Sequence, residues 1–335
     1  MSEEKGARPE VNPKKHHYVP RHVLRRFCDP PQTGVLWTYD KEAKQIYPGS
    51  PVCQASENHF YSFESSKGFD NKTIEVDFLS KIDDAGSTAI ESVLRREQLS
   101  EDRVIDFMRF AACQMIRVKT HFQRLDALLS PILQESAERL AKYDAEFKTG
   151  LADRLRERGG GEAEIADFMS SIERGEFKLT ANRGYLVSIF LSTLDSVTKS
   201  FCQMDWRFAT REDGAEAFVT SDNPLVLDDI GEGEAKPLGI MNPTIEVSMP
   251  LSPTTVALAR WGESAGYGYG PLDSDYVAAI NQRTINRALR FVYASKKSDE
   301  LLATVVSAQG KQARMHLEKR KEGDATIFAT TYLPD

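Results

Sequence analysis

The chain of 335 residues has little cysteine and histidine and no long apolar run. No apolar run exceeds about six residues, far short of the roughly 20 that span a bilayer. The first twenty residues contain no apolar signal-peptide core. The four cysteines lie far apart and form no C-x-x-C pair, which argues against a structural zinc site and a disulfide framework. We therefore expect a cytoplasmic protein with no membrane partner.

Charge is the next constraint. A net charge of −7 argues against broad, non-specific nucleic-acid binding, but it leaves a local basic site open, because the charges that line a cleft set its field. One stretch, "KKHHYVPRHVLRRF" at 14–27, holds three of the six histidines, five basic residues and no acidic residue. This stretch is the first candidate for such a site.

The hydrophobic pattern changes along the chain. Residues 35–63 are rich in aromatic and β-branched side chains, residues from Ile74 onward repeat at helical spacing, and the period falls to two from Trp206. This order predicts an α+β fold in which a helical central region packs with β-rich N-terminal and C-terminal segments. The predicted organisation is a disordered lead-in at 1–13 and a single domain at 14–335, β-rich over 14–68, helical over 70–204 and mixed over 205–335.

Local signals refine this outline. Ser100 is placed to cap a helix that continues past Phe122, and Pro131 should kink or restart it. Residues 182–203 should form a strongly apolar helix, while "RERGGGEAE" at 155–164 breaks the helical region. The glycine-rich tract at 262–271 lacks phosphate-loop spacing, and we interpret it as a mobile loop or lid with tyrosines at its tip.

The basic stretch contains a conformational break at Pro20. The preceding residues should be extended, so that His16 and His17 point to opposite faces, and Arg21 should begin a helix. In the functional interpretation, His17 or His16 is an acid/base, nucleophile or metal ligand, while Arg21 and Arg25 bind a phosphate or carboxylate. In the alternative, His17 is a hydrogen-bonded core residue and the arginines form ion pairs.

A second polar motif, "TSDNP", follows the apolar residues 217–219. Asp222 is predicted either to orient His17 or to hold a metal ion, with Ser221 and Asn223 contacting substrate. The alternative is a turn that uses its own Asx hydrogen bonds. Arg117, within the apolar segment "FAACQMIRV", is a further substrate-binding candidate, because a buried arginine needs either a carboxylate or a ligand anion.

Several motifs together resemble those of a known family. They are "HHYVPRHVLRRF" (16–27), "WTYDK" (37–41), "ENHFYSF" (57–63), "TSDNP" (220–224), "PLSP" (250–253) and "INQRTINRALRFVYAS" (280–295). This set is similar to the mainly bacterial family called domain of unknown function 4238, over about residues 14–295. The family pattern has an aromatic–leucine pair where this chain has His22, Val23 and Leu24. The resemblance implies no activity.

Three functions remain open from the sequence, of which the third, a hydrolase with Ser221 as nucleophile, lacks a G-x-S-x-G elbow. The first is a phosphoester hydrolase, most plausibly a nuclease, with His17 activating water, arginines on the phosphates and a divalent metal such as Mg²⁺ as cofactor. The "HHYVP" motif of this chain is only loosely similar to the core of ββα-metal nucleases. Those enzymes need a further Asn and a further His or Asn soon after the motif, and this chain has neither before Asn58 and His59. The second is a non-catalytic regulatory protein that binds a nucleotide or nucleic acid. The sequence carries no signal for an oligomeric state.

Overall fold

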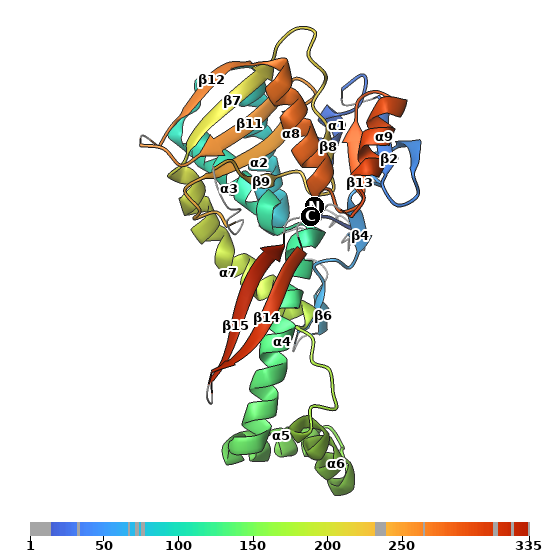
Figure 1. Ribbon diagram of the computed structural model, residues 1–335, viewed down its shortest axis with the longest axis vertical. Helices are drawn as coiled ribbons and strands as arrows, with labels where there is room; N and C mark the ends of the chain where they lie inside the picture. The colour runs from blue at the N-terminus through green and yellow to red at the C-terminus, as the bar shows by residue number, and fades with distance from the viewer. Residues whose placement is uncertain are drawn as a thin grey trace, which may run out of the picture. The chain divides into compact units, whose positions relative to one another are not determined.

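A computed structural model gives the architecture of the chain (Figure 1). The structure describes residues 15–31, 34–65, 68–70, 74, 78–231, 239–263, 265–310, 314–322 and 325–333. The predicted lead-in at 1–13 lies outside these residues. Within them the fold is α+β, as predicted, with nine helices and fifteen strands. None of the described helices is both long and apolar enough to cross a membrane.

The chain folds into two compact units. The first consists of Met1–His121, Val187–Arg314 and Tyr332–Asp335, and the second of Phe122–Leu186 and Met315–Thr331. The single domain predicted over 14–335 stays a prediction, but the sequence showed no sign of this subdivision. All candidate site residues fall in the first unit.

A five-stranded sheet forms the larger β-layer of the first unit (Figure 1). All neighbouring strands are antiparallel except the pair β12 and β7, which run parallel. Its strands, in spatial order, are β12 (Tyr267–Leu272), β7 (Asp205–Arg211), β11 (Thr255–Arg260), β10 (Ile245–Ser252) and β9 (Val226–Asp229).

Helices cover this sheet on both faces. Helix α8 (Ser274–Arg287) packs Val277 and Ile280 against one face, in a cluster with Val256 and Leu258. On the other face, Phe107 of α3 (Glu101–Ile116) meets the rings of Trp206 and Phe208 edge-on, at centroid distances of 5.4 and 5.0 Å. Helices α2 (Ser80–Leu94) and α7 (Arg183–Cys202) complete that side. Because β10 is covered on both faces, all eight of its residues are buried.

A four-stranded antiparallel sheet forms the second β-layer of the first unit. Its spatial order is β3 (Gln45–Gly49), β2 (Leu36–Asp40), β13 (Phe291–Ala294) and β8 (Thr220–Ser221). One face is apolar and packs Tyr39, Val219 and Val292 with residues of α8 and α9 (Asp299–Ser307). The sheet therefore joins the beginning of the chain to residues near its end.

Short elements hold the basic stretch in place. Strand β1 (Lys15–His17) pairs antiparallel with β4 (Ser56–Asn58), and α1 (Arg21–Arg26) begins directly after Pro20, as predicted. A second short pair is β5 (Phe63–Ser65) with β6 (Gly68–Asp70).

The second unit is mainly helical, and some of its elements also extend into the first unit. Its elements are most of α4 (Lys119–Tyr143), α5 (Ala145–Glu157), α6 (Glu162–Glu173), the start of α7, and most of β14 (Arg314–Glu322) and β15 (Ala325–Leu333), which pair with each other. The break between α5 and α6 falls within the predicted 155–164, and α7 matches the predicted 182–203.

The structure corrects two local predictions. The helix capped by Ser100 ends at Ile116 rather than continuing past Phe122, and Pro131 lies inside the next helix, α4. The glycine-rich tract is not a lid at Tyr267 and Tyr269, because both lie in strand β12. The Leu99 amide donates to the Tyr267 hydroxyl at 2.7 Å, and the Tyr269 hydroxyl donates to the Glu97 carbonyl at 2.8 Å. These two tyrosines fasten the connection between α2 and α3 to the sheet.

Candidate functional site

The first candidate residue, His17, is the last residue of strand β1 and is buried. Its Nε2 atom lies 3.1 Å from the Val52 carbonyl oxygen and 3.3 Å from Arg21 Nε. One ring nitrogen cannot donate and accept at once, and the shorter distance to the carbonyl favours a proton on Nε2. Burial and then the Arg21 guanidinium lower the pKa of His17 from 6.5 to about 4. The ring is therefore neutral at physiological pH.

His16 points to the opposite face of β1, as alternation along a strand requires. Its Nδ1 accepts a 2.9 Å hydrogen bond from the Tyr61 amide, and its ring stacks on that of Tyr61 at 5.7 Å. The exposed fraction of His16 is 1%. The predicted divergence of the two histidines is confirmed, and His16 is built into the core around Tyr61.

The arginines of α1 divide into two kinds. Arg26 is buried and donates to Glu91 Oε1 at 2.7 Å, to Ser87 and to the His22 carbonyl. Arg21 and Arg25 are exposed, and among the described residues neither forms an ion pair with a carboxylate. The two arginines of α1 that were predicted to contact a ligand, Arg21 and Arg25, are therefore the two that are exposed.

His22 lies between these arginines and belongs to the buried network. Its Nδ1 is 2.7 Å from Arg26 Nη1, and its ring packs at 5.3 Å from that of Phe110. Burial and then Arg26 lower the pKa of His22 to about 3. His22 is thus a packed, neutral side chain.

Arg117 is fully buried at the C-terminal end of α3. It donates to Asp83 Oδ1 of α2 at 2.6 Å and to the His17 carbonyl oxygen at 2.7 Å. Of the two partners that a buried arginine could take, a carboxylate or a ligand anion, the structure supplies the carboxylate. Arg117 therefore supports the strand that carries His17, and its predicted contact with substrate stays a prediction.

The second motif forms a closed turn at the end of β8. The Ser221 hydroxyl donates to the Asn223 carbonyl at 2.9 Å and accepts from the Asn223 amide at 3.1 Å. The Asn223 side chain donates to the Arg287 carbonyl at the end of α8. These are the local hydrogen bonds of the alternative interpretation, extended by one contact to a helix C-terminus.

Asp222 binds the main chain that joins α8 to β13. Its Oδ1 accepts from the Leu289 amide at 2.7 Å, and its Oδ2 accepts from the amides of Arg290 and Phe291 at 2.8 and 2.9 Å. Burial raises the pKa of Asp222, while these amides and Lys41 act in the opposite direction. The orientation of His17 by Asp222 stays a prediction: the Nε2 atom of His17 lies near the Val52 carbonyl and Arg21, while three main-chain amides bind the Asp222 carboxylate.

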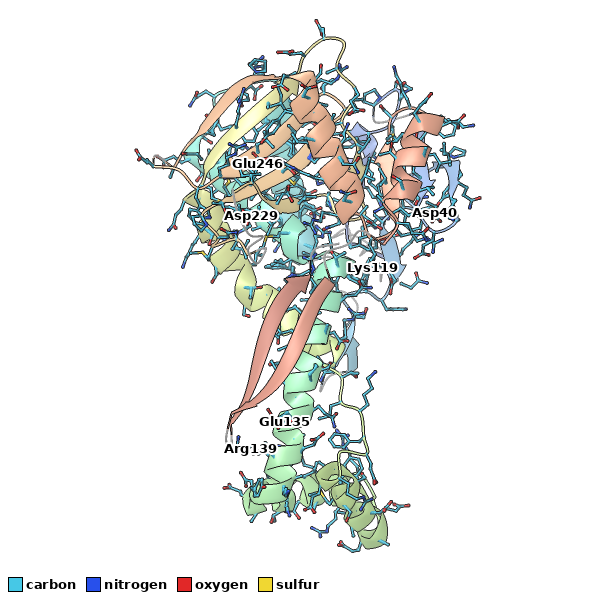
Figure 2. The ribbon with its side chains drawn as sticks, viewed as in Figure 1. Asp40, Lys119, Glu135, Arg139, Asp229 and Glu246 are labelled. Atoms are coloured by element: carbon cyan, nitrogen blue, oxygen red, sulfur yellow. The ribbon has the colours of Figure 1, made fainter. Side chains whose placement is uncertain are left out.

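The two motifs nevertheless come near each other, through Tyr18 rather than His17. Burial and then the negative charge of Asp222 raise the pKa of Tyr18. Lys119, labelled in Figure 2, pairs with Glu57 and lies 5.1 Å from the centre of the Tyr18 ring. The sequence did not predict the proximity of Tyr18 and Asp222. Tyr18 stands inside the "HHYVP" motif, but no spacing rule connects that motif to a turn some two hundred residues later.

The described residues contain no group of three or more His, Cys, Asp or Glu side chains placed to hold a metal ion. Their titratable groups instead form ion-pair networks. The largest surrounds Glu246 of β10 (Figure 2), which is 1% exposed. It accepts from Arg260 at 2.6 Å, Arg283 at 2.5 Å and the Tyr276 hydroxyl at 2.7 Å. This network joins the sheet to α8, and its carboxylate is fully engaged.

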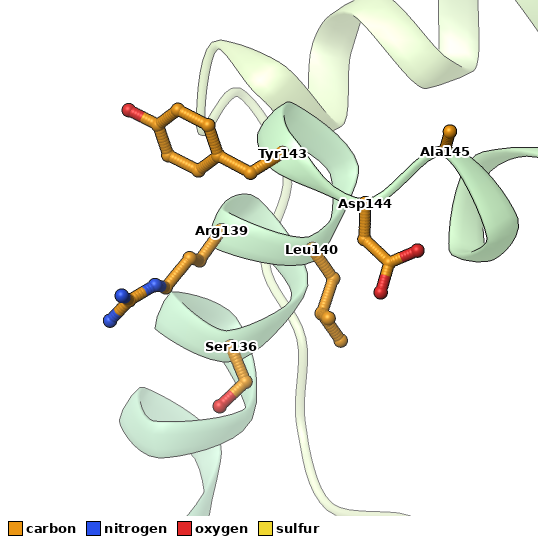
Figure 3. Close-up of a pocket in the computed structure, with 6 residues that line it drawn as sticks. All are labelled: Ser136, Arg139, Leu140, Tyr143, Asp144 and Ala145. Atoms are coloured by element: carbon orange, nitrogen blue, oxygen red, sulfur yellow. The ribbon is translucent and has the colours of Figure 1, made fainter.

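The second unit carries a hollow of about 620 Å³ at the junction of α4 and α5. Figure 3 shows Arg139 and Tyr143 projecting from the same side of α4. Asp144, also in the lining, is occupied as the N-cap of α5, where it accepts from the Phe147 amide at 2.9 Å. The hollow contains none of the predicted site residues.

The geometry thus defines an α+β protein in which the exposed Arg21 lies beside the buried, neutral His17, with the exposed Arg25 on the same short helix. The family model described as "Protein of unknown function (DUF4238)" matches residues 15–298. The chain belongs to this family. Neither a curated protein nor a solved structure matches the chain.

Proposed function

We propose that the protein binds a phosphate-bearing ligand, a nucleotide or a nucleic-acid strand, through Arg21 and Arg25 beside His17. The observation that supports this proposal is the arrangement at the start of α1, where an exposed guanidinium lies 3.3 Å from the ring of a buried histidine and has no carboxylate partner among the described residues. Arginine donors bind phosphate oxygens in a planar, bidentate geometry.

The electrostatic surroundings of His17 support an anionic ligand. Besides burial, three cations lower its pKa, Arg21 most strongly and then Lys15 and Arg117. Arg117 is compensated by Asp83, whereas Arg21 is not compensated within the described part of the chain. A bound phosphate would offset this excess of positive charge, so ligand binding and protonation of His17 should favour each other.

The experiment is a titration of the full chain with nucleoside mono- and triphosphates and with a short single-stranded RNA, followed by calorimetry. Loss of one charge-assisted contact costs about 1.5–3 kcal/mol, or roughly 10- to 100-fold in Kd. We expect Arg21→Gln to weaken binding by this factor, and added salt to weaken binding to the wild type.

The matched control is Arg109→Gln, which removes another exposed arginine, from α3. If Arg21→Gln and Arg109→Gln bind equally well, or if the wild type binds none of these ligands, the proposal is wrong.

Phosphoester hydrolysis at the same place is the second candidate. It is favoured by the state of His17, whose low pKa leaves the ring able to accept a proton at neutral pH. In this scheme the Val52 carbonyl orients the ring and Arg21 holds the phosphate. Turnover of RNA or a diester substrate, with Mg²⁺, Mn²⁺ or a chelator present, separates the candidates. If the protein is a hydrolase, the wild type should turn over substrate, and His17→Gln should abolish turnover while ligand binding persists. If the wild type binds but does not turn over substrate, only the binding proposal stands.

A further inference from the structure

A row of hydroxyl side chains crosses one face of the four-stranded sheet. Thr38 on β2 stands opposite Tyr47 on β3 and Tyr293 on β13, and Tyr293 stands opposite Thr220 on β8. Directly opposed residues of antiparallel strands place their side chains on the same face. Tyr47, Thr38, Tyr293 and Thr220 therefore form one continuous line, which we call the hydroxyl row.

Three members of the hydroxyl row are completely enclosed. Thr38, Tyr293 and Thr220 each have an exposed fraction of 0%. Their hydroxyl oxygens have no hydrogen-bond partner in the described part of the chain. The Ala55 amide acts on the pKa of Tyr293 but does not meet the geometry of a hydrogen bond. Buried hydroxyls without partners are rare, and three in one line point to a shared partner.

The opposite face of the sheet has no such feature. There Tyr39 and Val292 belong to an apolar cluster, and the Tyr39 hydroxyl donates to the Lys296 carbonyl at 2.7 Å. The buried tyrosine hydroxyl on that face is thus hydrogen-bonded within the protein, in contrast to the three buried hydroxyls of the row. On the hydroxyl row the described part of the chain supplies no such partner.

The edge strand β3 packs closely against one end of the row. A Cβ atom on Gly49 would come within 2.5 Å of Thr38 Oγ1 and 2.9 Å of Gln54 Nε2. Glycine is therefore required at this position, because Thr38 and Gln54 already fill the space that a side chain would occupy. Tyr47 lies at the open end of the row, on the edge strand β3, and is only partly buried.

We propose that the hydroxyl row is a binding site for ordered water molecules, which bridge Thr38, Tyr293 and Thr220 and enter past Tyr47. Water fits the size and the chemistry of the row, because each molecule both donates and accepts and uses about three hydrogen bonds when buried. The row ends at Thr220, two residues before Asp222, so these waters lie where the two sequence motifs approach each other.

The sign of a stability change tests the proposal. Thr38→Val, Thr220→Val and Tyr293→Phe remove the hydroxyl groups while keeping the shape of the side chains. If each hydroxyl is bonded to water, its loss leaves that water under-bonded, and each substitution should lower the melting temperature by about 2–4 °C. If the row is dry, removal of an unpaired polar atom should leave the melting temperature unchanged or raise it, which overturns the proposal.

Ser248→Ala is the control, because Ser248 carries a buried, unpartnered hydroxyl in the other sheet. The substitutions in the row are expected to lower the melting temperature by more than Ser248→Ala does, because the hydroxyl groups of the row share their waters. A second measurement does not depend on the variants: a high-resolution crystal structure of the wild type should show water density within hydrogen-bond distance of Thr38 Oγ1 and Tyr293 OH. Absence of that density contradicts the proposal.

Discussion

Arg117 at the end of α3 donates a 2.7 Å hydrogen bond to the main-chain carbonyl oxygen of His17, one hundred residues earlier in the chain. The same guanidinium binds Asp83 of α2. One buried cation therefore connects two helices with the strand that presents the candidate site. This arrangement separates support of the site from contact with a ligand.

Replacement of Arg117 by methionine should be strongly destabilising. It leaves the Asp83 carboxylate and the His17 carbonyl without their donor, and breaking a buried pair from one side costs about 3–5 kcal/mol. Urea denaturation measures the loss. Arg103→Met is the control, because the Arg103–Asp106 pair is exposed and should contribute no more than about 1 kcal/mol. A loss for Arg117→Met as small as that of the control would contradict the supporting role.

Acid should destabilise the protein through His17. The pKa of His17 is about 4 in the folded state and near 6.5 in the unfolded chain, so the unfolded chain binds the proton first as pH falls. The free energy of unfolding should therefore decrease from about pH 6.5 to about pH 4, with no contribution from His17 above that window.

Thermal denaturation of the wild type and His17→Gln across this range is the measurement. The variant should lose less stability than the wild type on acidification. Arg21→Gln provides a second check by NMR titration, because removal of its charge should raise the pKa of His17. An unchanged histidine titration in that variant would show that the two side chains are not close.

Asp222→Asn should weaken the junction between α8 and β13. The carboxylate accepts from three main-chain amides, whereas the asparagine side chain has one acceptor oxygen and would turn its NH₂ group toward N–H donors. Hydrogen bonds to a charged group contribute about 1.5–3 kcal/mol, and we expect a loss of at least that size in denaturant unfolding. A variant as stable as the wild type would contradict this structural role of Asp222.

Tyr267→Phe should loosen the connection between α2 and α3. The Leu99 amide would lose its acceptor, which is worth about 1 kcal/mol, and its hydrogen exchange should quicken roughly fivefold. Tyr269→Phe is a matched control, since the Tyr269 hydroxyl binds the Glu97 carbonyl and leaves the Leu99 amide bonded. Equal exchange of Leu99 in both variants would rule out the specific contact.

Local signals predicted local structure well. The side chain of Ser100 accepts from the Arg103 amide at the start of α3, as its capping position indicated, and the apolar spacing of 182–203 corresponds to α7. These features depend on residues within a turn or two of one another. The same holds for the opposite orientation of His16 and His17, which follows from strand alternation alone.

The predictions that failed or stayed incomplete concern features whose structure depends on residues far apart in the sequence. The glycine-rich tract looked mobile because its strand character comes from pairing with β7, some sixty residues earlier. Arg117 was recognised as a buried charge, but nothing near it in sequence identified Asp83 as its partner. Asp222 binds amides 67 to 69 residues away, and no spacing rule connects a turn to the start of a later strand.

The strand order β3, β2, β13, β8 also affects synthesis of the protein. The hairpin of β2 and β3 leaves the ribosome early, but its partner β13 is made only after Phe291 is reached. Until then β2 has an unpaired edge, and such edges template association with other chains. Nascent or truncated chains that end before Phe291 are therefore the forms most in need of chaperones, and C-terminal truncation should lower the yield of folded protein sharply.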